Sequence, residues 1–115
     1  MKHFINIKDV PYKTLRKILS DTKKRKDLRK KLKTLEIDKD NPLKGILLIQ
    51  MFEKSSLRTR LSFYLAIRQL GGSALTLRPD ELHLSKGGES LSDTAKILST
   101  YGDIFVFITD NEKKL

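Results

Sequence analysis

The sequence predicts an α/β fold, a three-layer arrangement in which a parallel sheet carries helices on both faces. Two apolar runs, at 46–52 and 104–108, have the composition of buried strands. Helical and strand-like patterns alternate between them, joined by short polar links. The order strand, helix, strand, helix, strand implies right-handed crossovers and a parallel sheet. The run at 46–52 is nearly uniformly apolar, so we expect it to be the central strand.

The part of the chain before the first strand is predicted to be helical. Apolar residues recur at helical spacing after Pro11, which predicts a helix over 11–20, and a second helix follows or continues it to about Leu35. The next segment, DKDNPLKG at 38–45, has the composition of a turn, because its proline disfavours helix at the residue before it. This turn leads into the first strand.

The middle of the chain reads as a helix followed by a short strand. Apolar side chains at 63, 66, 67 and 70 follow helical spacing and predict about three turns. Gly71 and Gly72 come directly after them and supply the left-handed conformation that ends many helices. A short strand is then expected at 74–77.

The last part of the chain predicts one more helix and a third strand. Ser90 and Asp93 have capping-box spacing ahead of a helix that we expect to reach about Tyr101. The run IFVFI at 104–108 is expected to be another buried strand. A sheet of three strands has two open edges and little helical cover, so we interpret residues 1–115 as one incomplete domain that is marginally stable or self-associating.

The chain is strongly basic, with 24 Lys and Arg against 14 Asp and Glu and a formal net charge of +10. Eight of the twelve residues at 22–33 are Lys or Arg, on a stretch with leucines at helical spacing. A solvated basic face is our preferred interpretation. Nucleic-acid binding is the alternative, which we favour less because no aromatic residue lies among these charges to stack on bases.

Composition also limits the chemistry. The chain contains no Cys, which excludes disulfides, thiolate metal sites and a cysteine nucleophile, and we expect neither a metal nor a cofactor. The longest apolar run is far shorter than the roughly 20 residues needed to span a bilayer. We therefore expect no membrane association and a cytoplasmic location.

The link between the first strand and the next helix, EKSSLRTR at 53–60, is the strongest candidate for a binding site. In parallel α/β sheets, ligands bind where strands end and helices begin. A helix N-terminus attracts anions, and the link adds two Ser, one Thr and two Arg. It lacks the glycines of nucleotide-binding loops, so the ligand is expected to be small, most naturally a phosphate. The alternative is ordinary helix capping beside two solvated arginines.

Three segments together resemble a known family. FEKSSLRTRLSF, IRQLGG and GGESLSDTAKILSTYGD are similar to the amino-terminal region of the ornithine and aspartate carbamoyltransferases. The likeness covers essentially the whole chain but only about the first third of such an enzyme. IRQLGG and DTAKILS look more like the ornithine branch, whereas the LSKGGES loop fits the aspartate branch equally well, and we favour ornithine. The resemblance implies an incomplete carbamoyl-phosphate-binding domain, without the amino-acid-binding domain.

The resemblance implies roles for the residues of the 53–60 link. Ser56, Arg58 and Thr59 match signature residues that hold the phosphate of carbamoyl phosphate, and Arg60 matches the second Arg of the signature. Leu57 departs from the family, because the signature has a Thr there whose hydroxyl helps to bind the phosphate.

Two further regions bear on the site through the same resemblance. Lys86 lies in a loop that, in aspartate-type enzymes, reaches into the site of a neighbouring subunit of the homotrimer, and His83 falls where ornithine-type enzymes have a loop Gln. Both residues also fit an ordinary solvated loop. The third strand normally ends in an Arg that polarises the carbamoyl carbonyl, whereas this chain has Ile108 and Thr109.

These features support one main hypothesis and two alternatives. The main one is an ornithine carbamoyltransferase-like chain that binds phosphate or carbamoyl phosphate but is inactive alone. The first alternative is an aspartate carbamoyltransferase-like chain or one chain of a split enzyme, in which a second chain carries the remaining parts. The second alternative is a basic nucleic-acid-binding module.

Overall fold

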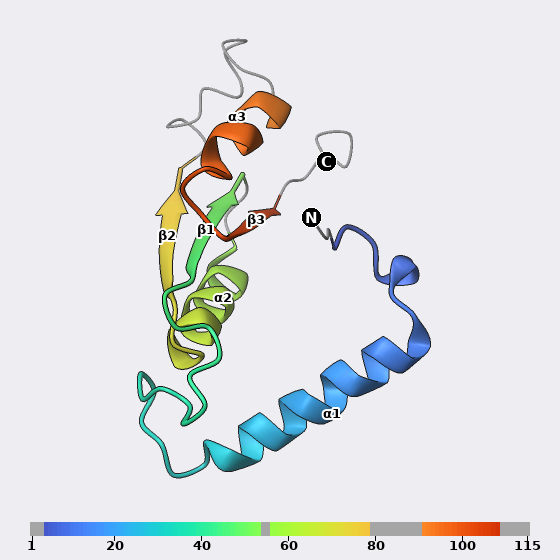
Figure 1. Ribbon diagram of the computed structural model, residues 1–115, viewed down its shortest axis with the longest axis vertical. Helices are drawn as coiled ribbons and strands as arrows, with labels where there is room; N and C mark the ends of the chain where they lie inside the picture. The colour runs from blue at the N-terminus through green and yellow to red at the C-terminus, as the bar shows by residue number, and fades with distance from the viewer. Residues whose placement is uncertain (1–3, 54–55, 79–90, 109–115) are drawn as a thin grey trace. The chain divides into compact units, whose positions relative to one another are not determined.

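The computed structural model describes residues 4–53, 56–78 and 91–108. Its elements in chain order are the 3-10 helix η1 (Ile7–Asp9), α1 (Tyr12–Leu28), β1 (Leu47–Phe52), α2 (Leu57–Gln69), β2 (Ser73–Leu77), α3 (Leu91–Leu98) and β3 (Ile104–Ile108) (Figure 1). The chain divides into two compact units, Met1–Lys33 and Thr34–Leu115.

The first unit contains one continuous helix, α1, where the sequence suggested one or two. It ends at Leu28, so the prediction that helix extends to about Leu35 was wrong. The amide of Arg29 closes the last turn on the carbonyl of Arg25 at 3.0 Å, and turns follow. Arg25 and Lys26 lie in that last turn, where cations are favourable beside the unpaired carbonyl groups.

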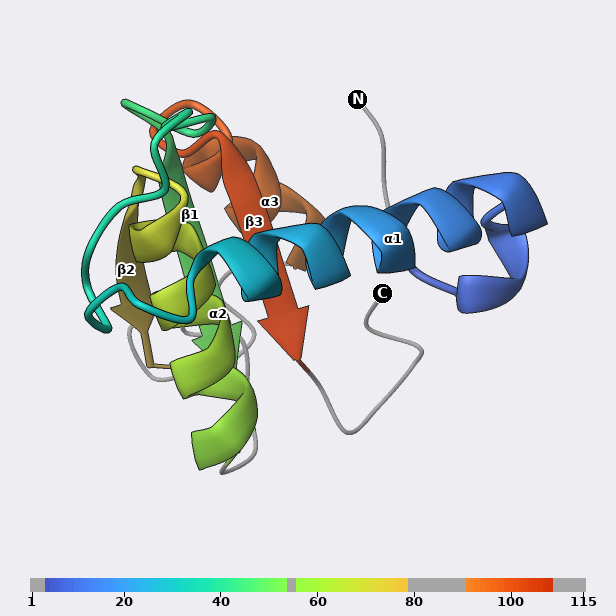
Figure 2. The same ribbon diagram turned by 90° about the horizontal axis from the view of Figure 1, so that it is seen from below.

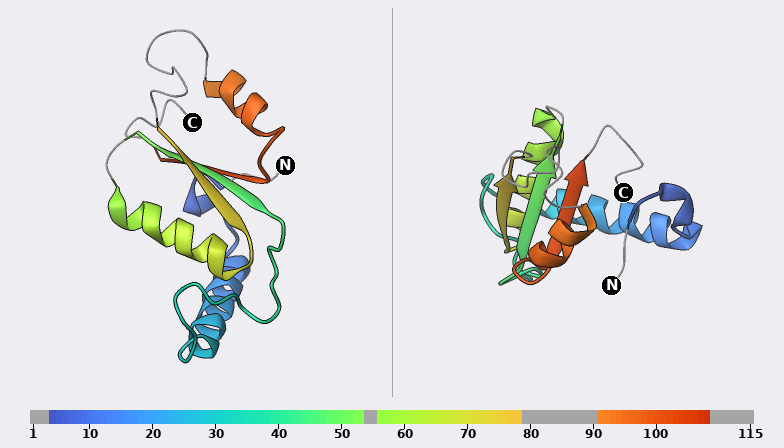
Figure 3. Two further views of the ribbon diagram at one scale, coloured as in Figure 1. Left: turned by 90° about the vertical axis from the view of Figure 1, so that its left-hand side faces the viewer. Right: turned by 90° about the horizontal axis from the view of Figure 1, so that it is seen from above.

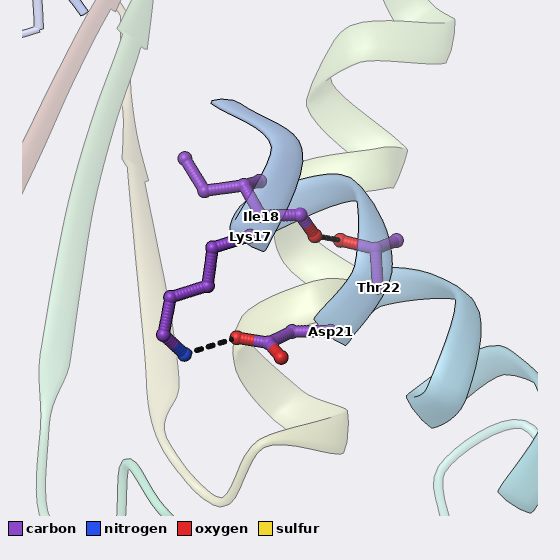
Figure 4. A network of polar contacts seen from close by, with 4 residues as sticks. All are labelled: Lys17, Ile18, Asp21 and Thr22. Carbon is purple, nitrogen blue, oxygen red and sulfur yellow. Dashed lines mark hydrogen bonds and ion pairs between the residues drawn. The ribbon is translucent and has the colours of Figure 1, made fainter. Parts of the chain in front are cut away.

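Local side-chain contacts support the middle of α1 (Figure 4). Lys17 Nζ lies 2.8 Å from Asp21 Oδ2, and Thr22 Oγ1 donates to the Ile18 carbonyl at 2.7 Å. The hydrogen bond from Lys17 lowers the pKa of the Asp21 carboxyl. The contact between Lys17 and Asp21 therefore stabilises the helix at pH values above the ordinary pKa of an aspartate, and this stabilisation is lost as the pH falls through the lowered pKa. Both side chains are exposed, so the contribution is small.

The second unit is built on a parallel three-stranded sheet in the order β2-β1-β3 (Figure 2). Met51 of β1 pairs with Leu77 of β2, and Phe52 pairs with Ile108 of β3. The three strands therefore end together at one edge. This arrangement confirms the predicted parallel sheet and the central position of β1.

Helices α2 and α3 lie on opposite faces of this sheet (Figure 3). The chain moves outward from β1 to β2 through α2, then returns across β1 to β3 through α3. Because parallel crossovers share one hand, two crossovers in opposite directions place their helices on opposite faces. The structure thus confirms the three-layer α/β prediction.

The core is centred on β1. Leu48, Ile49 and Met51 are almost fully buried, and Ile67 of α2 packs in the same core. The predicted burial of β1 is confirmed, whereas the prediction that 104–108 is another buried strand is confirmed as a strand but was wrong in the degree of burial. Residues of β3 are only half-buried, and Ile104 is 41% exposed, because β3 is an edge strand.

The end of α2 has the hydrogen bonds of a Schellman motif. The amide of Gly71 donates to the Arg68 carbonyl at 3.1 Å, and that of Gly72 donates to Ile67 at 2.8 Å. Gly71 has a φ of +106°, which confirms the predicted left-handed stop. Gly72 is required for a different reason, since a Cβ there would lie 2.7 Å from the Ile46 carbonyl oxygen.

Several element boundaries differ from expectation by one to three residues. Strand β1 begins at Leu47 because the Ile46 amide closes a turn on the Leu43 carbonyl at 3.0 Å. Helix α3 ends at Leu98, before the expected end near 101, because the next amides bond three residues back, Thr100 to the Ile97 carbonyl at 3.1 Å and Tyr101 to the Leu98 carbonyl at 3.0 Å. The capping role predicted for Ser90 lies outside the described residues.

Candidate phosphate-binding turn

The candidate site lies at the carboxyl edge of the sheet, between β1 and α2. Strand β1 ends at Phe52, and the amide of Glu53 then donates to the Ile108 carbonyl at 2.9 Å, which ties the start of the turn to β3. Helix α2 begins four residues later, at Leu57. The turn therefore occupies the position at which parallel α/β sheets bind their ligands.

Ser56 is the N-cap residue of α2. Its carbonyl accepts the first helical hydrogen bond, from the Arg60 amide at 3.0 Å. Its side chain makes no capping hydrogen bond, with backbone angles φ −151° and ψ 68°. The Ser56 side chain is therefore not the ordinary helix cap of the alternative interpretation, and it does not compete with a ligand for the amides of the first turn.

The predicted site residues do not all lie on one side of the helix. Ser56, Thr59 and Arg60 are related by three and four positions, so they share a face, whereas Arg58 lies on another side. Ser56 and Thr59 are partly buried, and both arginines are exposed. The first turn of α2 contains no acidic residue, so neither its partial positive charge nor the two guanidinium groups have an acidic partner within that turn.

Leu57 is 57% exposed at the first helical position. It offers the turn its backbone amide but no side-chain donor. An apolar side chain exposed to this degree contributes little to the core, so its replacement by a polar residue is structurally acceptable.

Sequence reasoning missed two charged residues at the same edge. Glu53 follows β1 directly, and Arg78 follows β2, the neighbouring strand. Both take part in polar or electrostatic interactions within the chain. Position immediately after a predicted parallel strand was the available signal, because the carboxyl ends of neighbouring strands meet at one edge.

Other predicted site residues fall outside the described part of the chain. His83 and Lys86 belong to the 79–90 segment, and Thr109 follows β3 beyond the described range. Ile108 is described, as the partly buried last residue of β3 beside Phe52. At that position the chain presents an aliphatic side chain to the carboxyl edge, with no group that can donate a hydrogen bond.

Within residues 4–53, 56–78 and 91–108, no three His, Asp or Glu side chains gather as metal ligands. In the same part of the chain, no helix has the length and apolarity needed to cross a membrane.

Fold and site together define a parallel α/β domain with a candidate anion-binding turn after its central strand. Residues 2–115 match the family model described as the aspartate/ornithine carbamoyltransferase, carbamoyl-P binding domain. The chain therefore belongs to the aspartate/ornithine carbamoyltransferase family and corresponds to its carbamoyl-phosphate-binding domain.

Similar proteins are consistent with this assignment. The chain is 43% identical to the ornithine carbamoyltransferase of Brucella ovis over 116 residues, covering 100% of this chain and 35% of that protein. It is 36% identical to that of Cereibacter sphaeroides, covering 100% of this chain and 37% of that one. The chain thus spans about a third of the length of the curated relatives it matches.

Solved structures of both branches share the fold. Ornithine carbamoyltransferase from Burkholderia thailandensis superposes with a TM-score of 0.83 at 32% identity, covering 99% of this chain and 37% of that one. The catalytic subunit of aspartate transcarbamoylase from M. jannaschii gives a TM-score of 0.75 at 36% identity, covering 93% of this chain and 33% of that one.

Proposed function

We propose that the turn from Ser56 to Arg60 binds the phosphate group of carbamoyl phosphate. The observation that carries this proposal is the N-terminus of α2 at the carboxyl edge, where the Ser56 side chain makes no capping bond, in a chain that matches a carbamoyl-phosphate-binding domain over residues 2–115. Unpaired amides at a helix N-terminus point toward a bound anion, and the helix dipole favours its charge. The Ser56 hydroxyl, free of a capping bond, supplies a further donor.

Arg58 and Arg60 supply charge that a bound phosphate needs. Cations beside a helix N-terminus are unfavourable, so the two arginines destabilise the empty turn. A bound anion offsets this unfavourable charge. A guanidinium can donate two parallel hydrogen bonds to phosphate oxygens. Inorganic phosphate carries the same recognition element, so it is the simplest probe.

The reaction we propose for the family site is transfer of the carbamoyl group to the amine of ornithine, as in the ornithine carbamoyltransferases that the chain resembles. The amine nitrogen forms a bond to the carbamoyl carbon, the bond from that carbon to the phosphate oxygen breaks, and the amine loses a proton. The products are citrulline and phosphate. This turn stabilises the charge that develops on the departing phosphate, an electrostatic contribution that requires no metal or cofactor.

The remaining functions of such a site need groups beyond this turn. Ile108 cannot polarise a carbonyl, and the chain spans about a third of its relatives' length. We propose that the site is completed in a homotrimer, with Lys86 and His83 reaching a neighbouring copy, or by a second chain. We place the reaction in arginine biosynthesis in the cytoplasm. Sedimentation of the chain with and without carbamoyl phosphate tests the trimer.

Replacing Arg58 by alanine is expected to weaken phosphate binding by about tenfold or more. A charge-assisted hydrogen bond contributes roughly 1.5 to 3 kcal/mol, which converts to a factor of about 10 to 150. Binding by the unmodified chain is expected to be millimolar or weaker, because the entropy of association offsets much of the gain in an open site. Amide chemical shifts of residues 56–60, followed during titration with phosphate and with carbamoyl phosphate, measure both affinities.

Two variants control this experiment. Arg16→Ala removes the same exposed group from α1 and is expected to leave the affinity unchanged. Arg58→Lys keeps the charge but loses the paired geometry, so it should restore only part of the affinity. Shifts that spread over residues 22–33 and persist in Arg58→Ala would show that the basic run, and not this turn, binds phosphate.

Replacing Leu57 by threonine is expected to tighten phosphate binding about fivefold. The new hydroxyl adds one hydrogen bond at the first helical position, worth about 1 kcal/mol. Because Leu57 is 57% exposed, the substitution should change the free energy of unfolding little. Leu61→Thr, one turn further along α2, makes the same chemical change at a side chain that is 48% exposed. An equal gain in both variants would contradict the assignment of this turn.

A further inference from the structure

The net charge of the protein is concentrated in its first compact unit. Residues 1–33 contain thirteen Lys and Arg and three Asp, a formal charge of +10, whereas residues 34–115 contain eleven basic and eleven acidic residues and are neutral. A surface charge that merely kept the protein in solution needs no such segregation. The division gives one unit the capacity to recognise a polyanion by itself.

Most of this charge lies on exposed side chains of α1 and the turn after it. Lys23, Lys24 and Lys26 are exposed and have no ion pair within the described residues. Two of the three acids already have a cationic partner, Asp21 with Lys17 at 2.8 Å and Asp27 with Lys30 at 3.5 Å. The positive charge of these three exposed lysines is therefore accessible to a ligand.

The geometry of α1 distinguishes between kinds of polyanion. Residues 23–26 are four consecutive cations, and at 3.6 residues per turn they surround the helix. A helix that lies on a lipid surface needs an apolar stripe beside its cations. Ile18 and Leu19 form the start of such a stripe, but Lys26, one to two turns later on the same face, interrupts it with a cation. A groove with phosphates on both sides fits this distribution better.

We propose that the unit Met1–Lys33 binds the phosphate backbone of double-stranded DNA, with α1 along the major groove. That groove is about 12 Å wide and accommodates one α-helix between two rows of phosphates. The lack of aromatic residues in the basic run argues against stacking on single-stranded bases, which duplex binding does not use. Helix α1 contains neither Asn nor Gln to read base edges, and its contacts are charge contacts with phosphates. Binding is therefore independent of the DNA base sequence. The proposal is independent of phosphate binding at Ser56–Arg60.

The test measures the salt dependence of duplex binding by the full chain. A fluorescently labelled 20-base-pair DNA duplex is titrated at several salt concentrations, and the slope of log K against log salt is determined. Each phosphate contact contributes about 0.9 to that slope, so the triple variant Lys23→Gln, Lys24→Gln, Lys26→Gln is expected to reduce it by about 2.7. Gln has nearly the helix propensity of Lys, and circular dichroism checks that α1 is retained. A triple Lys→Arg variant should keep the slope.

A charge-matched control separates local binding from total charge. Lys39→Gln, Lys44→Gln, Lys96→Gln removes three exposed charges from the neutral unit and is expected to leave the slope unchanged. Arg58→Ala should also leave duplex binding unchanged. An equal loss in the two triple variants overturns the proposal. Absence of duplex binding at low salt also overturns the proposal. So does binding to phosphatidylglycerol vesicles in place of duplex DNA, if that vesicle binding is lost in the double variant Ile18→Ser, Leu19→Ser.

Discussion

Replacing Gly71 by alanine is expected to lower the free energy of unfolding by about 3 kcal/mol, a large part of the stability of a small domain. Gly71 ends α2 with a φ of +106°, a conformation that residues with a Cβ rarely adopt. The new Cβ would also overlap the Asn41 side-chain oxygen and lie 3.3 Å from the Lys44 amide nitrogen. Urea unfolding followed by circular dichroism measures the loss.

Two comparisons separate backbone strain from steric overlap at Gly71. Gly45 also has a positive φ, +80°, but a Cβ there would meet no atom within 4 Å, so Gly45→Ala should cost only the strain. Asn41 has a φ of +45°, which glycine also adopts, and Asn41→Gly removes the overlapping oxygen. In that background Gly71→Ala should cost no more than Gly45→Ala. Equal losses at Gly71 and Gly45 in the unmodified chain would show that overlap contributes nothing.

The position of this glycine was predictable from the sequence, but its close contact was not. A Gly pair after a helical pattern indicates a left-handed stop through local chemistry alone. The overlap with Asn41 depends on two segments thirty residues apart, joined by the hydrogen bond from the Leu43 amide to the Leu70 carbonyl at 2.8 Å. Local patterns carry no information on such approaches.

The degree of burial of the two apolar strands was likewise not predictable from local sequence patterns. The runs at 46–52 and 104–108 have similar apolar composition, yet β1 is buried and β3 is half-exposed. Composition predicts that a segment is a strand, whereas its place in the sheet decides how much neighbouring strands and helices cover it. The order β2-β1-β3 leaves β3 with one partner within the described residues.

The candidate site was predictable in position and only partly in geometry. A polar, arginine-containing link after the central strand identified the turn at 53–60, because parallel sheets bind ligands at that edge. The sequence did not indicate that the Ser56 side chain makes no cap bond, since Ser at this position usually caps. Arg78 was overlooked because it lies far from the link along the chain, although β2 is adjacent to β1.

The otherwise apolar strand β1 contains one polar side chain that is fully buried. Gln50 is 0% exposed, in the middle of the central strand. Its Nε2 donates to Thr76 Oγ1 at 2.9 Å, across the β1–β2 pair. Its Oε1 is buried and has no hydrogen-bond partner among the described residues. If the amide is turned over, the hydroxyl donates to oxygen and the nitrogen lacks a partner, so one polar atom is unsatisfied in either orientation.

Replacing Gln50 by methionine is therefore expected to raise the free energy of unfolding by up to about 2 kcal/mol. A buried polar atom without a partner costs roughly 1 to 3 kcal/mol, and the single hydrogen bond to Thr76 returns about 1 kcal/mol of that. Methionine has nearly the length and flexibility of glutamine, so the core volume changes little. Thr76 is exposed, and water replaces its lost partner. The midpoint of urea unfolding should rise while its slope stays constant.

The pair Gln50 and Thr76 also permits a double-mutant cycle. Thr76→Val in the unmodified chain removes the only partner of the buried amide and should lower the free energy of unfolding by about 1 to 2 kcal/mol. In the Gln50→Met background the same substitution leaves no polar group unsatisfied and should be nearly neutral, because valine suits a strand as well as threonine does. The cycle then gives a coupling energy of about 1 to 2 kcal/mol. A Gln50→Met variant less stable than the unmodified chain, with no coupling to Thr76, would show that the buried amide is satisfied.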